Sequence, residues 1–421
     1  MRVLIFEPQF MGHNLVHAAR LVRGVRELGC VPVLATSSQA VRSAEFAKHI
    51  EAHLTGCEVV ELDGFKTDPH GRRLQTNGVA GSIHVYRSLK WSIDRSKPGH
   101  LYVPYGNFLA RMAAAPFGLS SALRRCGAEA ETLMVGGRYL YAKTGLLHRV
   151  RQRALLNAIA AGPWASVFHL DDAAYEQFQR HGGRMARIGK LLPEPVGDHA
   201  PTDRLAARRS FGIPTEGRLV AVIGLIERRK GLDLLTDAFR RAESRLEATD
   251  RLALIGPHHP EVKELLTTDY ADLVARGRVV GADHRLSEAE MVRAACAADV
   301  VATVYPNHLY ASGSLVVAAQ ARRPVLGSDA GWIGRTIERF QLGHTCDPAQ
   351  PLSVAGGLID SFDAASAYQP SPAAMRFVDF VSDRNYLALW TSRLRERLGV
   401  EPSPHARSWG WALHGETRKA A

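Results

Sequence analysis

Hydrophobic and polar positions in the first 190 residues alternate between short apolar runs and helical periodicity. An apolar run at Val3–Phe6 predicts a strand, apolar residues then recur at helical spacing over residues 15–28, and residues 31–35 form a second apolar run. Strand, helix and strand in this order predict a parallel βαβ unit, although the G-x-G-x-x-G spacing of a dinucleotide site is absent. Further strands are predicted at residues 58–62, 101–104, 131–135 and 165–170, and helices at residues 108–115 and 146–161.

A similar alternation restarts after the proline-containing stretch at residues 191–203, which is typical of an extended linker. Strands are predicted at residues 219–223, 252–255, 278–280, 300–304 and 324–327, and helices at residues 204–211, 232–239, 261–266, 288–297 and 313–321. We therefore predict an α/β protein with two Rossmann-like domains that face a central cleft. The predicted order is a first domain at 1–190, the linker, a second domain at 204–376, a long helix at 377–398 and a loosely ordered, flexible tail at 399–421.

Composition places the 421-residue chain among globular proteins, with 46% hydrophobic and 23% charged residues. Its apolar runs are far shorter than the ~20 residues of a membrane span, and the first run has the length of a strand rather than of a signal core. The five cysteines lack the short spacing of a zinc or redox motif, so we expect reduced thiols in a cytoplasmic protein.

The net charge of +11 does not by itself predict nucleic-acid binding. Arginines are spread along the whole chain, and only 7% of the residues are aromatic, so no basic and aromatic platform is apparent. A positive cleft for acidic substrates, contact with an anionic membrane surface and genomic base composition are three explanations that the sequence does not separate.

Three consecutive cations lie in the turn after the central strand of the second half. Leu219–Ile223 is a near-continuous apolar run, Gly224 ends it, and Arg228, Arg229 and Lys230 precede the next helix. At the carboxyl edge of a parallel sheet, cations in such a turn favour a phosphate group. A solvated basic turn is the alternative.

Several short blocks of the second half stand in the order found in retaining glycosyltransferases of the GT-B fold, family 4. The chain resembles this family over roughly residues 1–395, more weakly in the first half, where MRVLIFEP, the Gly12 loop and GCVPVLATS agree. The matching blocks of the second half are Gly224–Gly231 with Asp233, Leu234 and Ala238; Leu254–Gly256; Val279–Gly281 with Leu286–Met291; Ala298–Val300 with Tyr305 and Pro306; Arg323–Val325; and Ser328–Gly331 with Leu342 and Gly343.

The resemblance implies a UDP- or GDP-sugar as co-substrate, no other cofactor, and a last helix that crosses back to the first domain. Lys230 stands at the family's lysine position, and with Arg229 it is implied to offset the charge that grows on the leaving diphosphate. Leu225 replaces the family's arginine after the strand glycine, and Arg228 is a candidate substitute. Val279 is a further implied donor contact.

A second phosphate-binding element is predicted where Ser312, Gly313 and Ser314 open a helix after a strand. Backbone N–H groups at such a helix start bind phosphate well. The alternative is that Ser312 only caps the helix.

The chain departs from the family at two glutamates that usually stand eight positions apart on this loop and helix. Leu309 and Val317 occupy those positions, so the family's glutamate contact to the ribose hydroxyls is lost. His308 lies beside the first position and is a candidate for sugar contact. A divergent enzyme and a protein that has lost catalysis both fit this departure.

In the first domain, Gly12 and His13 follow the first strand and are expected to face the cleft. Gly12 would let the backbone approach the donor or the acceptor. His13 is a candidate catalytic group, with an ordinary loop histidine as the alternative. Residues 105–107 are also expected at the cleft, without the histidine that family members often have there, and a structural role is expected for residues 169–172.

The resemblance implies a metal-independent hexosyltransferase that retains anomeric configuration, because the family's leaving diphosphate is thought to help deprotonate the incoming hydroxyl. No D-x-D metal motif or carboxylate dyad is apparent. One alternative is a degenerate protein that binds nucleotide-sugar or scaffolds glycan assembly, and another is a sugar-nucleotide epimerase. A glycan, a lipid-linked molecule and a small molecule remain open as acceptors, in the cytoplasm or at the inner face of the membrane.

Overall fold

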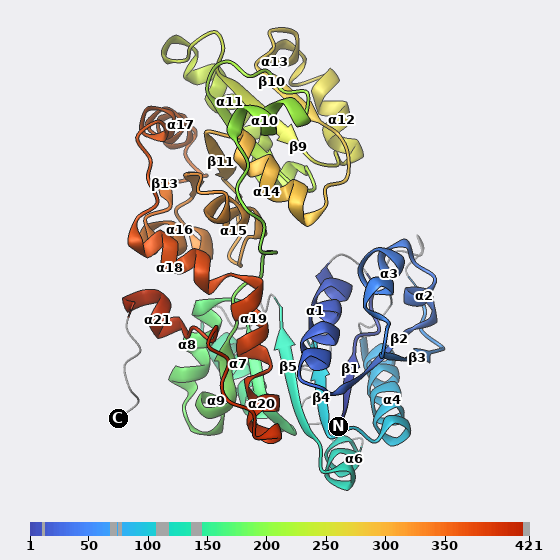
Figure 1. Cartoon of the computed structure of the whole chain (residues 1–421). Helices are drawn as coiled ribbons and strands as arrows, with labels where there is room; N and C mark the ends of the chain where they lie inside the picture. Colours follow the sequence, from blue (N-terminus) through green and yellow to red (C-terminus); the bar gives the residue numbers. More distant parts are fainter. Residues whose placement is uncertain (11–12, 68–73, 75–77, 107–117, 136–144, 416–421) are drawn as a thin grey trace. The chain divides into compact units, whose positions relative to one another are not determined.

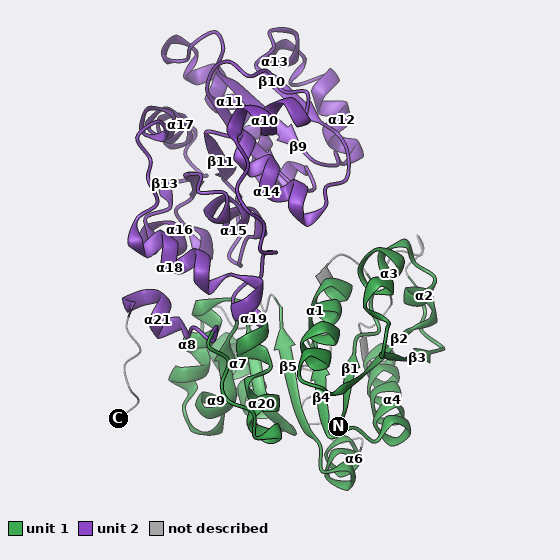
Figure 2. Cartoon of the chain, in the orientation of Figure 1, with its two compact units in different colours: residues 1–192, 387–404 green, residues 193–386, 405–421 purple. Residues whose placement is uncertain are grey.

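The computed structural model describes residues 1–10, 13–67, 74, 78–106, 118–135 and 145–415 (Figure 1). The chain divides into two compact units, and each is described by itself. Unit 1 is Met1–Leu192 with Leu387–Pro404, and unit 2 is Pro193–Tyr386 with His405–Ala421 (Figure 2). Gly12, Asn107 and the helix predicted at residues 108–115 lie outside the described residues.

Unit 1 is built on a seven-stranded sheet with the order β3-β2-β1-β4-β5-β6-β7. The paired strands are parallel, as the βαβ pattern predicts. The strand order reverses between β1 and β4, which is where open α/β sheets usually bind ligands. The strands are β1 (Arg2–Phe6), β2 (Val31–Ser37), β3 (Glu58–Leu62), β4 (His100–Val103), β5 (Glu129–Met134), β6 (Trp164–His169) and β7 (Gly189–Leu191).

The helices of unit 1 connect these strands. One of them, α4, has no counterpart in the sequence prediction, although Val85, Leu89 and Ile93 are fully buried at the helical spacing i, i+4 and i+8. The helices are α1 (His13–Glu27), α2 (Ser38–Val41), α3 (Ala44–His49), α4 (Gly78–Ser96), α6 (Leu119–Cys126), α7 (Leu146–Ala161), α8 (Asp172–His181) and α9 (Gly183–Ile188), with a 3-10 turn at Glu51–His53.

The single helix predicted at residues 377–398 is instead three helices, α18 (Pro372–Phe380), α19 (Asp383–Trp390) and α20 (Ser392–Leu398). The first break occurs where the Val196 amide donates to the Val381 carbonyl at 3.2 Å, and the Ser382 hydroxyl accepts from the Asn385 amide. A backbone that pairs outside the helix at this point cannot continue the helical ladder.

The C-terminal segment packs into unit 1 through Trp390, which is fully buried. Its ring centroid lies 6.0 Å from those of Tyr102 and Phe168. The guanidinium of Arg393 donates two hydrogen bonds to the Glu129 carboxylate, at 2.7 and 2.8 Å. A buried aromatic contact and a bidentate ion pair therefore attach residues 387–404 to the sheet of unit 1.

The tail is more ordered than the sequence predicts. Trp409–His414 form α21, which Ser408 caps by accepting from the Trp411 amide at 3.2 Å. Trp409 packs against Phe380 and Phe340, with ring centroids 5.2 and 5.7 Å away. The two tryptophans give this short helix apolar surface to bury, which the prediction of a loose tail overlooked.

Unit 2 is built on a six-stranded parallel sheet with the order β10-β9-β8-β11-β12-β13. Its strand order reverses between β8 and β11. The strands are β8 (Leu219–Ile223), β9 (Arg251–Ile255), β10 (Val279–Ala282), β11 (Val300–Thr303), β12 (Val325–Ser328) and β13 (Gly343–Cys346). The helices are α10 (Arg204–Ser210), α11 (Leu232–Arg241), α12 (Pro260–Thr267), α13 (Ala271–Ala275), α14 (Glu288–Ala297), α15 (Gly313–Gln320), α16 (Gly331–Phe340) and α17 (Pro351–Ala365), with 3-10 turns η3 (Arg228–Lys230) and η4 (Glu243–Arg245).

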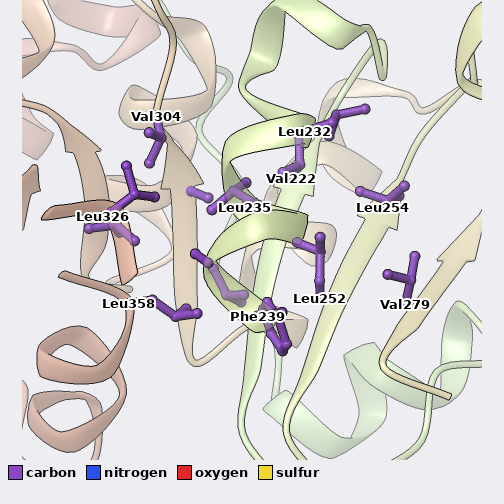
Figure 3. Close-up of a cluster of buried hydrophobic side chains, with 14 of the residues drawn as sticks. Val222, Leu232, Leu235, Phe239, Leu252, Leu254, Val279, Val304, Leu326 and Leu358 are labelled. Atoms are coloured by element: carbon purple, nitrogen blue, oxygen red, sulfur yellow. The ribbon is translucent and has the colours of Figure 1, made fainter. Parts of the chain in front are cut away.

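The core of unit 2 lies where α11 and α17 pack against the sheet (Figure 3). Leu235 and Phe239 of α11 meet Val222 and Leu252 of the central strands, and all four are buried. Each such side chain contributes about 1.5–3 kcal/mol relative to an exposed one. This core holds the ends of β8 and β11 in place, and both strands end at the same edge of the sheet.

The cysteines and the length of the helices can be compared with the sequence predictions. All five cysteines are free thiols. None of the helices in the described part of the chain combines the length and the apolar character needed to cross a bilayer.

Candidate functional site

The loops after β8 and β11 meet at the point where the strand order of unit 2 reverses. A Cβ atom at Gly231 would lie 1.9 Å from the Val304 carbonyl oxygen, and Gly231 has a φ of +77°. Gly224, which ends β8, has a φ of +84°. Only glycine adopts this backbone without strain and allows so close an approach. The two glycines therefore bring the turn η3 against the loop that leads to α15.

Lys230, the last residue of the turn η3, is buried. Its ammonium group donates a hydrogen bond to the Ile223 carbonyl, which the Ser314 hydroxyl also approaches at 3.4 Å. Among the described residues no carboxylate forms an ion pair with Lys230. Burial lowers the pKa of Lys230 below its usual range, and the nearby Tyr305 opposes that shift. A buried cation without a counter-charge is costly, so the site favours an incoming anion.

The other two cations of the turn are exposed and paired locally. The Arg228 guanidinium lies 2.6 Å from the Asp233 carboxylate and 3.6 Å from that of Glu261. Arg229 pairs with Glu227. The structure therefore separates the three consecutive cations into one buried group that lacks a carboxylate partner and two solvated ion pairs.

The N-terminus of α15 lies beside Lys230. Ser312 occupies the cap position, but its hydroxyl makes no capping hydrogen bond. The amides of Leu315 and Val316 donate to the Ser312 carbonyl at 3.1 and 3.2 Å, which leaves the Gly313 and Ser314 amides as the first donors of the helix. A Cβ at Gly313 would meet nothing within 4 Å, so the first residue of the helix is open on the side where a side chain would stand.

His308 lies in the same loop, between two tyrosines. Its ring meets those of Tyr305 and Tyr310 edge-on, with centroids 5.4 and 5.8 Å away, and its Nε2 lies 3.4 Å from the Ala311 carbonyl oxygen. Burial lowers the pKa of His308, and the charge of Arg229 lowers it further. A neutral imidazole in this position is suited to hydrogen bonding rather than to carrying charge.

The start of helix α16 contacts the loop that contains His308 and Leu309. The Trp332 amide donates to the Leu309 carbonyl at 3.2 Å, and a Cβ at Gly331 would lie 2.8 Å from the His308 carbonyl oxygen. The side chain of Leu309 is 38% exposed, whereas Val317 is buried in α15. The backbone of the Leu309 loop is therefore held by α16, and neither Leu309 nor Val317 has a side chain that can form a hydrogen bond.

The remaining sequence candidates lie elsewhere or outside the description. Val279 begins β10, at its amino end, and its side chain belongs to the hydrophobic core (Figure 3). It is therefore not brought together with Lys230 and the α15 N-terminus. His13 is the first residue of α1 in unit 1, and Gly12 lies outside the described residues.

Unit 1 holds a carboxyl group that the sequence analysis did not select. Glu7 follows β1 at the reversal of strand order and is fully buried. Its Oε1 accepts from the Gln9 amide at 3.0 Å, while Oε2 has no hydrogen-bond partner among the residues that the structure describes. Burial raises the pKa of Glu7 to about 8, against smaller opposite effects of Gln9 and Asn14. A charged residue directly after a buried strand was the sequence signal for it.

His169 ends β6 and is also buried. Its Nδ1 accepts from the Asp171 amide at 3.0 Å, its Nε2 has no partner in the described part of the chain, and burial lowers its pKa to about 3. Asp171 caps α8 by accepting from the Ala173 amide at 2.8 Å. These contacts agree with the structural role that the sequence suggested for this segment.

Comparison with known proteins places the fold. No protein-family model matches the chain. It is 28% identical over 264 residues to the D-inositol 3-phosphate glycosyltransferase of Kribbella flavida, and 26% identical over 270 residues to that of Thermobifida fusca. These matches cover 60% and 62% of this chain, and 54% and 55% of the relatives, so the chain spans about half the length of the curated relatives it matches.

Solved structures match over almost the whole chain. Anabaena HepE in complex with UDP and glucose has a TM-score of 0.61 at 15% identity, with 95% of this chain and 99% of that chain covered. Sucrose-phosphate synthase from Thermosynechococcus elongatus has a TM-score of 0.68 at 14% identity, with the same shares covered. The chain therefore has the GT-B fold of two parallel Rossmann-like sheets, as the sequence predicts.

Proposed function

We propose that the protein is a glycosyltransferase that moves a hexosyl unit from a UDP- or GDP-sugar to a hydroxyl group, with retention of anomeric configuration. The observation that carries the proposal is Lys230, a buried cation with no carboxylate partner among the described residues, beside the open N-terminus of α15. The sequence similarity to glycosyltransferases supports the same activity.

The proposed chemistry follows from where negative charge grows. When the bond from the sugar to the diphosphate breaks, the leaving oxygen gains charge that Lys230 and the amides of Gly313 and Ser314 would stabilise. The diphosphate oxygen would take the proton of the incoming hydroxyl, so no protein carboxylate is required. The cation and the helix N-terminus would meet the diphosphate charge, and we therefore propose that no metal takes part.

The proposed donor contacts are of two kinds, hydrogen-bonding groups and positive charges. The hydroxyls of Ser312 and Ser314 and the neutral ring of His308 would hydrogen-bond the phosphates or the sugar, and Arg229 would add positive charge at the rim. Arg228 is held by Asp233 and Glu261 and would act only at longer range. The UDP named in the HepE complex supports a uridine nucleotide as the first donor to test.

The acceptor is proposed to bind through unit 1, at Gly12 and His13 after the first strand. The named substrate of the curated relatives, an inositol phosphate, supports an acceptor rich in hydroxyl groups. A glycan or a lipid-linked acceptor is compatible with the same chemistry. We place the protein in the cytoplasm, where its net charge of +11 would allow peripheral contact with the inner face of the membrane.

The test is release of nucleoside diphosphate from a panel of UDP- and GDP-sugars. Lys230→Met, which keeps the side-chain volume and removes the charge, is expected to lower turnover by about 100-fold or more. Lys263→Met is the matched control, because Lys263 is an exposed lysine of the same unit paired with Asp283 at 2.7 Å.

Two outcomes would contradict the proposal. Equal turnover in Lys230→Met and wild type would remove Lys230 from the reaction. Binding of donors without turnover, even with cell-extract acceptors present, would instead support the degenerate binding protein, which the comparisons do not favour.

A further inference from the structure

A surface pocket of about 310 Å³ lies in unit 1, between the end of β3 and the helix α4. The end of β3 supplies Glu61 and the following Asp63, and α4 supplies His84, Arg87 and Trp91. The three α4 residues stand at i, i+3 and i+7, so they share one face of the helix. The end of β3 and this face of α4 together line the pocket.

The wall of this pocket is fixed by local contacts. The Asp63 carboxylate accepts from the Ser38 hydroxyl at 2.6 Å, and His84 Nε2 lies 3.1 Å from the Asp63 carbonyl oxygen. The ring of Phe65 meets His84 edge-on, with centroids 4.5 Å apart. Gly64 has a φ of +80°, which lets the loop pass close to the His84 ring. The pocket is therefore largely preformed, which lowers the cost of binding.

The pocket combines an exposed aromatic ring with an acidic and a basic side chain. The indole of Trp91 is 47% exposed, although tryptophan is mostly buried in folded proteins. The Arg95 guanidinium lies 5.4 Å from the centre of that ring and supports it from α4. Within the described part of the chain, the Arg87 guanidinium and the Glu61 carboxylate have no hydrogen-bond or ion-pair partner.

These groups favour a neutral ligand with many hydroxyls. A flat aromatic surface matches the apolar C–H face of a sugar ring, and planar carboxylate and guanidinium groups can each bond two hydroxyls. Glu61 and Asp63 would repel a phosphate, while Arg87 and Arg95 would repel a basic peptide. The volume falls within the ~300–1,000 Å³ typical of small-ligand sites.

We propose that this pocket is a saccharide-binding subsite, with Trp91 as the stacking platform and Glu61 and Arg87 as hydroxyl partners. The inference deepens the proposed function and rests on it, because a sugar transferase is supplied with saccharides as acceptors or products. The subsite would hold part of an oligosaccharide that is longer than the unit being transferred.

The test follows the indole N–H signals of the ¹⁵N-labelled full chain by NMR, since the chain has only six tryptophans. Trp91→Ala identifies the Trp91 signal by its loss. Maltotriose, cellotriose, mannotriose and galactotriose are then added to the wild type at millimolar concentration. At least one of them is expected to shift the Trp91 signal in a saturable way.

The variants measure what each group contributes. Trp91→Ala and Glu61→Gln are expected to weaken binding of that saccharide by about tenfold or more. Trp411→Ala is the matched control, because Trp411 also carries an arginine over its ring, Arg407 at 5.2 Å, outside the pocket. The Trp411→Ala variant should bind the same saccharide with the affinity of the wild type.

Two results would overturn the inference. One is the absence of any Trp91 response to all four saccharides, and the other is equal affinity in Trp91→Ala and wild type. UDP binding, measured on the same sample by calorimetry, tests the donor site separately. A chain that binds UDP but leaves Trp91 unaffected would lose the subsite and keep the proposed function.

Discussion

The two units have the same kind of sheet, with a single reversal of strand order, yet the groups buried at the two reversals differ in sign. Unit 2 buries a cation, Lys230, and unit 1 buries an acid, Glu7. In both cases burial shifts the pKa toward the neutral form. The difference teaches that one scaffold can bury groups of opposite chemistry at equivalent edges, which agrees with the proposed anionic donor at unit 2 and the proposed hydroxyl-bearing acceptor at unit 1.

The supporting backbone also differs between the two edges. In unit 2, glycines at positive φ bring two loops together, and a Cβ at Gly313, the first residue of α15, would meet nothing within 4 Å. In unit 1, unpartnered polar atoms remain on Glu7 and on His169. In unit 2 the hydroxyls of Thr303 and Tyr305, at and just after the end of β11, are also buried with no hydrogen-bond partner among the described residues, so both edges keep polar groups that a ligand or a local movement would have to satisfy.

The largest expected effect is on the backbone of the unit 2 edge. Gly231→Ala would place a Cβ 1.9 Å from the Val304 carbonyl oxygen at a φ of +77°, so the two loops must separate. We expect a loss of roughly 3 kcal/mol or more of stability, together with loss of UDP binding. Thermal unfolding and calorimetry measure the two effects.

Gly313→Ala is the matched control for that change. Its Cβ would meet nothing within 4 Å, so thermal stability should change little. The added methyl group would stand at the first residue of α15, where the diphosphate is proposed to bind, and UDP affinity should fall. Equal stability of Gly231→Ala and Gly313→Ala would show that the close approach of the loops does not hold the unit 2 edge.

The sequence predicted the unit 2 edge better than the unit 1 edge, for physical reasons. Leu219–Ile223 is buried on both faces of a parallel sheet, so its apolar run was unambiguous, and Gly224 and Gly231 marked the turns. The burial of Lys230 and the exposure of its two neighbours could not be predicted, because three adjacent cations look alike until Asp233 and Glu227 are placed.

The signals for the unit 1 edge are weaker in the sequence. Glu7 was passed over because one acidic residue after a strand does not reveal whether water reaches it. Unit 2 has one such case as well: Val279 was selected from a block of similar sequence, yet its side chain belongs to the core, since it begins its strand rather than ends it. The parallel pairing of the strands was predictable from the βαβ pattern, whereas burial depends on contacts distant in sequence.

A second prediction compares the pH dependence of the two buried groups. The pKa of Glu7 rises from 4.5 to about 8 on folding, so the folded state keeps a proton that the unfolded state loses. The stability of the wild type should therefore fall, relative to Glu7→Gln, as pH rises from about 4.5 to about 8.

Lys230 should show the opposite trend. Its pKa is lowered from 10.5 on folding, so the unfolded state binds more protons in the alkaline range just below that value. The wild type should gain stability relative to Lys230→Met as pH rises through that range. Thermal unfolding of the three proteins across pH measures both trends. A pH-independent difference for either variant would mean that the group is solvated in solution.

The smallest expected effect separates a ligand contact from a helix cap. The hydroxyl of Ser312 stands at the cap position of α15 without a capping bond, whereas that of Ser371 accepts from the Ala374 amide at 3.1 Å and caps α18. Ser371→Ala should therefore cost about 1 kcal/mol of stability, and Ser312→Ala should cost less than about 0.5 kcal/mol.

The two serine variants should rank in the opposite order when their loss of UDP affinity is measured instead of their loss of stability. Ser312→Ala removes a hydroxyl beside the proposed diphosphate and should lower UDP affinity about five-fold, which corresponds to the roughly 1 kcal/mol of a neutral hydrogen bond. Ser371→Ala should leave UDP affinity unchanged, since α18 takes no part in the site. If Ser312→Ala instead costs as much stability as Ser371→Ala, the serine is an ordinary cap, and the α15 amides alone remain to bind the anion.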